Sequence, residues 1–276
     1  ALRQVKENLK AVDVVLELVD ARLPESSRNP QLSALLENKP HIIVLTKMDL
    51  ADPKMNQKWI NFYEKNGIPA IAVNSNSNSL KSIEKKISSI MDENKQKNEA
   101  KGIKFKRTKV MCVGIPNVGK STLLNHLVKK QVAQVGNRPG VTKAQQWLKA
   151  GKKLQLLDTP GILWPKFEDP MVGKKLALTG AIKDTLYPKD DVALYALEHF
   201  VKHNPQALMD RYRVSQENID DTTVELLLAI TKNAGFRDDY ERASERLIFD
   251  IRKGKLGRFT LDEIPADGKL DNNDKN

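Results

Sequence analysis

The sequence predicts an α/β fold in which a mostly parallel sheet is followed by an all-helical region. Five short apolar runs, nearly continuous in Val, Ile and Leu, are typical of strands that are buried on both faces. These runs are residues 12–19, 41–45, 68–73, 109–113 and 154–157. Each run ends at a polar or glycine-containing segment, and in parallel sheets ligands bind at the carboxyl ends of the strands. We therefore expect the segments that follow the five runs to form one site.

The chain beyond about residue 175 loses the strand pattern and shows Leu, Ala, Ile and Phe at helical spacing. Asp190 and Thr222 are predicted helix caps, because their side chains can accept hydrogen bonds from the free N–H groups of a first turn. Pro205 suits the first turn of a helix, and Gly235 suits a helix end. The sequence thus predicts an all-α C-terminal domain.

The domain organisation follows from these patterns. We predict a sheet domain over residues 1–175, a helical domain over 176–268 and a polar, disordered tail over 269–276. Residues 95–109 contain seven basic residues and one acid without a clean apolar period. This composition predicts a solvated linker between two halves of the sheet domain, and an additional role in touching phosphate stays open.

Composition limits the function classes. Lys and Arg number 46 against 35 Asp and Glu, which gives a net charge of +11 and favours polyanionic partners. Charge alone does not separate RNA from DNA or acidic lipid, and a basic protein without such a partner is the alternative. No run reaches the ~18 apolar residues of a membrane span. The single cysteine, Cys112, excludes an internal disulfide, so we expect a soluble, cytoplasmic protein with a buried thiol.

The segment "GIPNVGKS" at 114–121 fits the phosphate-loop pattern G-x-x-x-x-G-K-[ST] and lies between a predicted strand and a predicted helix. Gly114 and Gly119 permit a loop whose N–H groups turn inward, and Lys120 reaches the outer phosphates. The Ser121 hydroxyl is a predicted Mg²⁺ ligand. The nucleotide contacts that we expect here are Pro116, Asn117, Val118, Gly119, Lys120, Ser121 and Thr122.

Two further segments suit the terminal phosphate and its metal. "DTPG" offers Asp158, a carboxylate that can hold Mg²⁺ through water, and Gly161, whose N–H can bind the terminal phosphate. In "NRPGVT", Thr142 can complete the magnesium shell on a loop that is ordered by that phosphate. An ordinary Pro-Gly turn is the alternative for the second segment.

The segment "TKMD" at 46–49 resembles the base-reading motif of GTP-binding proteins. The Asp49 carboxylate can accept both the ring N–H and the exocyclic amine of guanine, a donor pair that adenine lacks. Lys47 would lie along the base, and Thr46 stands where the familiar motif has Asn, so that hydrogen bond is expected to be shortened or lost. A third base-side segment comprises Asn74, Ser75 and Asn76.

Longer stretches, "DARLPESSRNP", "GIPNVGKST", "RPGVT", "LLDTPGILWPKFEDP" and "TGAIKD", together resemble the YlqF/YawG group of circularly permuted GTPases over nearly the whole chain. The resemblance implies a permuted P-loop GTPase domain, in which the base-reading strands precede the phosphate loop, followed by a helical C-terminal domain. It also implies a Mg²⁺-dependent GTPase that binds GTP and GDP and assists assembly of the large (50S) ribosomal subunit. Such a protein would bind the precursor and its ribosomal RNA in the GTP state and leave after hydrolysis, as a monomer without DNA or membrane partners.

The same resemblance bears on hydrolysis. Ile162 occupies the place where many GTPases have a water-orienting Gln, so we expect slow turnover that the ribosomal subunit stimulates. Asn117 matches an Asn that binds a catalytic potassium ion in related GTPases. The catalytic set that we expect is Lys120, Asn117, Thr142 and Gly161. Members of the group also carry a His upstream of the position of Ala1, and its loss would impair stimulated activity.

Several assignments stay open. Arg252, Lys253, Lys255 and Arg258 are candidate RNA contacts, with a merely solvated face as the alternative. Asp20 and Arg22 are expected to be structural or switch-supporting. The alternative functions are a GTPase of transfer-RNA modification or signalling, or an RNA-binding scaffold that binds GTP without hydrolysing it.

Overall fold

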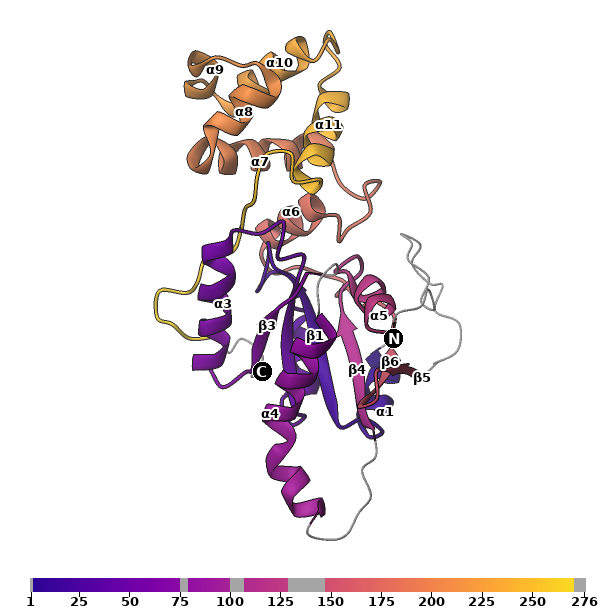
Figure 1. Cartoon of the computed structure of the whole chain (residues 1–276). Helices are drawn as coiled ribbons and strands as arrows, with labels where there is room; N and C mark the ends of the chain where they lie inside the picture. Colours follow the sequence, from indigo (N-terminus) through magenta and orange to yellow (C-terminus); the bar gives the residue numbers. More distant parts are fainter. Residues whose placement is uncertain (1, 75–78, 100–106, 129–146, 271–276) are drawn as a thin grey trace. The chain divides into compact units, whose positions relative to one another are not determined.

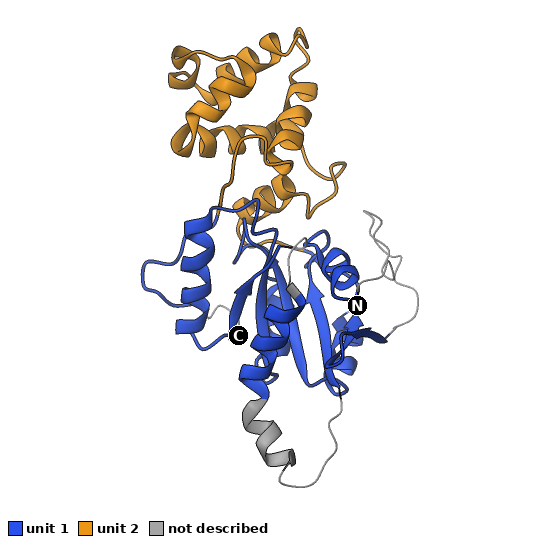
Figure 2. Cartoon of the chain, viewed as in Figure 1, with its two compact units in different colours: residues 1–165, 262–276 blue, residues 166–261 orange. Residues whose placement is uncertain are grey.

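The computed structural model of the chain describes residues 2–74, 79–99, 107–128 and 147–270 (Figure 1). It divides into two compact units, residues 1–165 with 262–276 and residues 166–261 (Figure 2). The division falls at Pro165, earlier than the predicted boundary at 175, because helix α6 (Pro170–Thr179) packs with the helices that follow it. The units are called the sheet unit and the helical unit below.

A six-stranded sheet forms the centre of the sheet unit, in the order β3-β2-β1-β4-β6-β5. The five predicted strands are all present and pair in parallel. Their bounds are β1 Val14–Asp20, β2 His41–Thr46, β3 Ala70–Ala72, β4 Thr108–Gly114 and β6 Leu154–Asp158. The sequence analysis missed the antiparallel edge strand β5 (Trp147–Ala150), which is short and not continuously apolar.

Parallel register brings the carboxyl ends of the strands together. Asp20 at the end of β1 lies opposite Thr46 at the end of β2, and Gly114 at the end of β4 lies opposite Leu18. Asp158 at the end of β6 lies opposite Cys112 of β4. The polar segments predicted to share one site therefore start from one edge of the sheet, although "TKMD" precedes the phosphate loop in the chain.

The helices of the sheet unit bury apolar faces against these strands. Their bounds are α1 Leu2–Leu9, α2 Pro30–Leu36, α3 Pro53–Lys65, α4 Ser79–Glu99 and α5 Lys120–Val128. One cluster joins α1 and α2 to β1, β4 and β6, and a second joins Trp59, Phe62 and Tyr63 of α3 to β1 and β2. Helix α4 extends into the predicted linker 95–109, because Lys, Gln and Glu are good helix formers.

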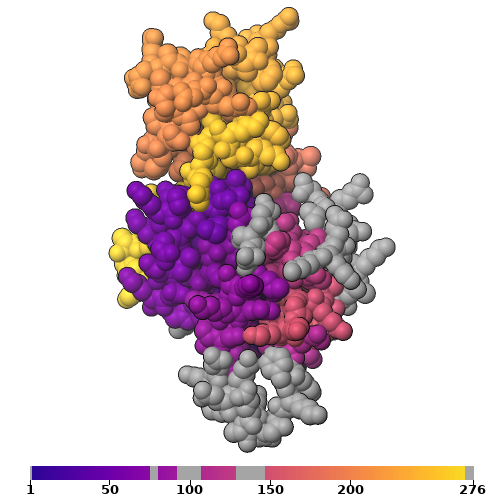
Figure 3. Space-filling model, in the orientation of Figure 1, coloured from indigo at the N-terminus to yellow at the C-terminus, as the bar shows by residue number. Residues whose placement is uncertain are grey.

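The end of the chain belongs to the sheet unit and not to the helical unit. Asp262 accepts hydrogen bonds from the backbone N–H of Glu25 and of Ser26, at 2.9 and 2.7 Å. Leu270 packs on the α3 cluster. The yellow C-terminal segment runs beside α3 in Figure 1 and forms the yellow patch at the left edge of Figure 3. The prediction placed residues 269–270 in a disordered tail, whereas the structure gives Leu270 an apolar contact and a hydrogen bond from its N–H to Asn66 Oδ1 at 3.3 Å. Residues 271–276 lie outside the described residues.

The helical unit contains α6 and the helices α7 Lys189–His203, α8 Pro205–Tyr212, α9 Gln216–Asp220, α10 Thr223–Asn233 and α11 Tyr240–Arg252. Thr222 caps α10 in a capping box with Glu225, Pro205 begins α8, and Gly235 follows α10 with a φ of 74°, as predicted. The prediction for Asp190 was wrong, because the N-cap of α7 is Pro188, two residues earlier, and Asp190 lies inside the first turn. Within the described residues no helix is long and apolar enough to cross a membrane.

Candidate nucleotide-binding site

The phosphate loop joins β4 to α5 and is shaped by its backbone. Asn117 and Gly119 take φ values of 58° and 98°, in the left-handed region that turns successive N–H groups toward one side. A Cβ on Gly114 would lie 2.8 Å from the Leu18 carbonyl oxygen of β1, so this position has room only for Gly. Lys120 begins α5, and its side chain is buried.

Lys120 and Asp158 form the charged centre of the site. Burial lowers the pKa of the Lys120 ammonium, and the Asp158 carboxylate opposes this shift. Burial likewise raises the pKa of Asp158, against the charge of Lys120. Each group therefore supports the charge of the other in a site with little water.

Magnesium fits the residues present at this centre. Asp158 Oδ1 is buried and has no hydrogen-bond partner among the described residues, as expected of an oxygen that faces a hydrated cation. Ser121, in the first turn of α5, is half-buried beside Lys120. The described residues contain no group of three or more His, Cys, Asp or Glu that could hold a metal. A hydroxyl, water and phosphate oxygens are the ligands that Mg²⁺ usually takes at nucleotide sites.

The segment after β6 passes unusually close to the phosphate loop. A Cβ on Gly161 would lie 2.8 Å from both the N and the Cα of Pro116. The Ile162 N–H donates to the Gly114 carbonyl at 3.1 Å. Gly161 is therefore required for the two backbones to meet.

Ile162 itself points away from this site. Its side chain is 7% exposed and belongs to the apolar cluster that contains Leu32 and Met111. Its carbonyl oxygen accepts a hydrogen bond from Asn29 Nδ2 at 2.9 Å. The residue in the water-orienting position is thus part of the core.

The base-reading segment is tied to the phosphate loop by side chains. Thr46 Oγ1 donates a hydrogen bond to the Val118 carbonyl oxygen at 2.5 Å. The shorter Thr side chain thus reaches the phosphate loop from the position where the familiar motif has Asn. Lys47 Nζ donates to the Asn117 carbonyl at 2.7 Å. Asp49 is exposed beyond them, where its carboxylate can meet a base.

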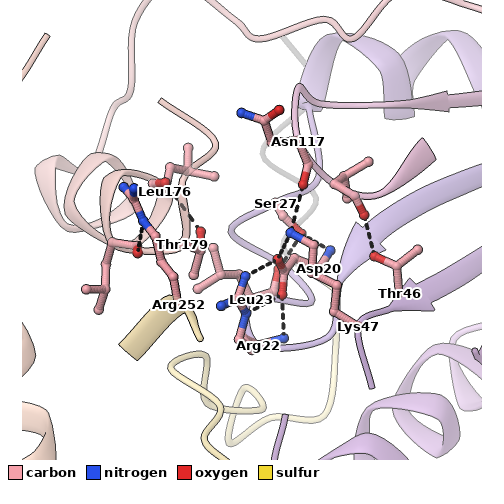
Figure 4. Close-up of polar contacts among 12 residues, drawn as sticks. Asp20, Arg22, Leu23, Ser27, Thr46, Lys47, Asn117, Leu176, Thr179 and Arg252 are labelled. Atoms are coloured by element: carbon pink, nitrogen blue, oxygen red, sulfur yellow. Dashed lines mark hydrogen bonds and ion pairs between the residues drawn. The ribbon is translucent and has the colours of Figure 1, made fainter. Parts of the chain in front are cut away.

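Asp20 and Arg22 were expected to be structural or switch-supporting, but the sequence did not indicate their connection to the base-reading segment. Asp20 is 3% exposed, and its carboxylate accepts hydrogen bonds from Arg22 and from Lys47 Nζ (Figure 4). The available signal was the polar "DAR" that follows β1 at the edge shared by the other motifs.

Three predicted site residues, Ser75, Asn76 and Thr142, lie outside the described residues. Asn74 is described and lies half-buried, just beyond β3. The structure thus brings the ends of β1, β2, β4 and β6 together and leaves the loop that contains Thr142 undescribed.

The four predicted RNA contacts differ in their surroundings. Arg252 donates to the Ala177 and Leu178 carbonyls at the end of α6, and to Asp184, all within the helical unit. Lys253, Lys255 and Arg258 are exposed. Arg252 therefore joins helices, and Lys255 Nζ pairs with the buried Asp250 Oδ1 at 3.3 Å from an exposed position.

Comparisons with known proteins identify the family of the chain. A family model described as RsgA GTPase matches residues 4–168, and one described as 50S ribosome-binding GTPase matches residues 109–232. The chain is 48% identical over 270 residues to ribosome biogenesis GTPase A of Priestia megaterium, a match that covers 95% of this chain and 93% of the relative.

Solved structures of YlqF share the fold. The GDP-bound structure of TM YlqF has a TM-score of 0.68 at 26% identity and covers 95% of this chain and 99% of that one. GNP-bound YlqF from T. maritima has a TM-score of 0.65 at 25% identity, with 95% and 97% covered. A guanine nucleotide, typically with Mg²⁺, is the ligand of this GTPase fold, and the phosphate loop, "DTPG" and "TKMD" meet at one sheet edge as such a ligand requires. The chain therefore belongs to the ribosome biogenesis GTPase A family: it is a GTPase that takes part in ribosome biogenesis.

Proposed function

We propose that this GTPase is an assembly factor for the large (50S) ribosomal subunit, which binds the pre-subunit and its ribosomal RNA in the GTP state and leaves after hydrolysis. The observation that carries the proposal is the match of residues 109–232 to the 50S ribosome-binding GTPase model, on a chain of net charge +11. A surface of that charge gains affinity for RNA through phosphate contacts and counterion release. The protein acts as a monomer.

The site residues take the following roles at the phosphates. Lys120 and the N–H groups of the phosphate loop neutralise the outer phosphates, and the Gly161 N–H binds the terminal one. Ser121, Thr142 and Asp158 hold Mg²⁺, which supplies charge stabilisation at the phosphates when bound. Support comes from the buried Asp158 Oδ1 without a partner among the described residues and from the close approach of Gly161 to the loop.

At the base, Asp49 accepts the guanine donor pair, Lys47 lies along the ring, and Asn74, Ser75 and Asn76 line the far side. The hydrogen bonds of Thr46 and Lys47 to the phosphate loop support this assignment, because they fix both segments in one unit. Together these groups select guanine over adenine.

Hydrolysis is completed by a partner. Because the Ile162 side chain is buried in the core, it cannot orient the attacking water. A K⁺ ion bound by Asn117 would supply positive charge near the transferred phosphoryl group. The ribosomal subunit would complete the arrangement that hydrolysis requires. Turnover is therefore slow in the free protein.

The helical unit provides RNA contacts through Lys253, Lys255 and Arg258. The Nζ atoms of Lys253 and Lys255 lie 5.7 and 5.4 Å from the ring centroid of Phe249, which is 47% exposed. An exposed aromatic ring beside two cations suits a phosphate backbone with an accessible base.

Sedimentation with ribosomal particles tests this function. We expect the protein to co-sediment with large-subunit precursors when a non-hydrolysable GTP analogue is bound, to dissociate with GDP, and to hydrolyse GTP faster with the particles. Small subunits are the matched control. Equal binding in both nucleotide states, or an unchanged rate with large-subunit particles, would contradict the proposal.

A further inference from the structure

A buried carboxylate, Asp20, lies between the base-reading segment and the phosphate loop. Its Oδ1 accepts from Arg22 Nε at 2.9 Å and its Oδ2 from Arg22 Nη2 at 2.7 Å (Figure 4). The same Oδ2 accepts from Lys47 Nζ at 3.0 Å. Burial would raise the pKa of Asp20, but the charges of Arg22 and Lys47 outweigh it and hold that pKa below its ordinary value. The carboxylate is therefore ionised and holds two cations at once.

Lys47 needs such a partner because its conformation is costly. Its φ is 54°, and the φ of Asn117, whose carbonyl it binds, is 58°. This region is disfavoured for residues that carry a Cβ, although Asn adopts it more readily than Lys. The bond from Lys47 Nζ to Asp20 fixes the ammonium where it reaches the Asn117 carbonyl, so the carboxylate supports the strained Lys47.

The loop that starts at Asp20 has other contacts that hold its shape. Glu17 accepts from Arg28 Nε at 3.1 Å, and Asp262 accepts from the Ser26 N–H at 2.7 Å. The Asp20 N–H donates to Ser27 Oγ at 2.9 Å, so the backbone of Asp20 is held independently of its carboxylate. The Asp20 side chain is therefore directed at Lys47 and Arg22 and is not the only brace of the loop.

We propose that Asp20 is a positioning residue for the guanine nucleotide, which presets Lys47 against both the base and the phosphate loop before the nucleotide arrives. The inference rests on the proposed function, in which Lys47 lies along the guanine ring. Preorganisation of this kind strengthens binding by reducing the ordering that the ligand must cause. It acts equally on GDP and GTP, so it affects affinity and not the chemical step.

A double-mutant cycle tests the inference in the full chain. We expect Asp20→Asn to weaken GDP binding by about ten- to hundredfold, the usual value of a charge-assisted hydrogen bond, and to raise KM for GTP similarly. The kcat at saturating GTP should stay within about twofold of the parent value, because the lost interaction stabilises bound GTP and the transition state equally. In a Lys47→Met background, Asp20→Asn should cause no further loss of GDP affinity.

Two further variants keep the test decisive. Asp20→Asn leaves Arg22 buried without its carboxylate, so Asp20→Asn/Arg22→Met removes the pair as a neutral unit and should show the same loss of GDP affinity. Asp262→Asn is the matched control, since it removes a carboxylate that braces the same loop without touching Lys47. It should bind GDP like the parent.

The outcomes separate this inference from the proposed function. If Lys47→Met binds GDP as tightly as the parent, the base-side role of Lys47 fails and this inference fails with it. If Lys47→Met weakens GDP while the Asp20 variants do not, only the positioning role of Asp20 is overturned. Equal losses from Asp20→Asn in the parent and Lys47→Met backgrounds, or a matching loss in Asp262→Asn, would also overturn it.

Discussion

Gly161 and Gly114 show how single residues set the geometry of the site. A Cβ on Gly161 would meet backbone atoms of Pro116 at 2.8 Å, and a Cβ on Gly114 would meet the Leu18 carbonyl at 2.8 Å. Backbone atoms cannot turn aside as a flexible side chain can. The phosphate loop therefore fits between β1 and the segment after β6 only because these two residues have no side chain.

Gly161→Ala should impair catalysis without unfolding the protein. The added methyl group must push "DTPG" and the phosphate loop apart, at a cost of about 1–3 kcal/mol, so we expect kcat/KM for GTP to fall about ten- to hundredfold. Steady-state GTPase kinetics measure the effect. Gly173→Ala is the control, because its Cβ would meet only the Phe167 ring, at 3.3 Å. Unchanged kinetics in Gly161→Ala would show that the two backbones need not meet.

At the scale of elements, the helical unit depends on one arginine that joins the end of α11 to the end of α6. Arg252 Nη2 donates to the Ala177 carbonyl at 2.7 Å, and Nε donates to the Leu178 carbonyl at 3.0 Å. Asp184 pairs with the same guanidinium at 2.8 Å. The helix end is thus capped by a side chain from a distant part of the chain.

Arg252→Met should destabilise the helical unit. The change leaves carbonyl groups and Asp184 without their donor, so we expect a loss of about 1–3 kcal/mol in the free energy of unfolding. Urea unfolding, with hydrogen exchange of the α6 amides as the local probe, measures this loss. Lys253→Met removes the same charge from an exposed neighbour and should be nearly neutral. Equal stability of the two variants would refute the capping role.

The sequence predicted those helices and strands whose own residues carry the pattern that identifies them. Continuous apolar runs identified the five parallel strands, and Thr222 and Pro205 identified helix starts. Strand β5 was missed because its pairing with β6 stabilises it and its own composition does not. Asp190 failed as a cap because a carboxylate inside a first turn also suits the helix dipole, so its residue type does not fix the boundary.

At the scale of the whole molecule, the net charge of +11 implies that the proposed RNA binding weakens with salt. Replacing Lys253, Lys255 and Arg258 by Gln should weaken binding to large-subunit ribosomal RNA and lower the slope of log K against log salt by about 0.7 to 0.9 for each phosphate that the variant no longer neutralises. Filter binding over a salt series measures the slope. The control replaces the exposed Lys54, Lys58 and Lys65 of α3 by Gln. Equal effects in both triple variants would mean that charge alone, and not this surface, binds RNA.

The sequence by itself determined the strands, the motifs at their ends and the charge, because these are properties of neighbouring residues. The resemblance to the YlqF/YawG group implied a permuted GTPase, and the parallel sheet brings "TKMD" and the phosphate loop to one edge whichever comes first. Only the tertiary structure decided that Asp20 holds Lys47, that Ile162 faces the core and that the end of the chain returns to the sheet unit. Each of these depends on partners far apart in the chain, and a buried charge or apolar side chain takes its role from whatever the fold places beside it.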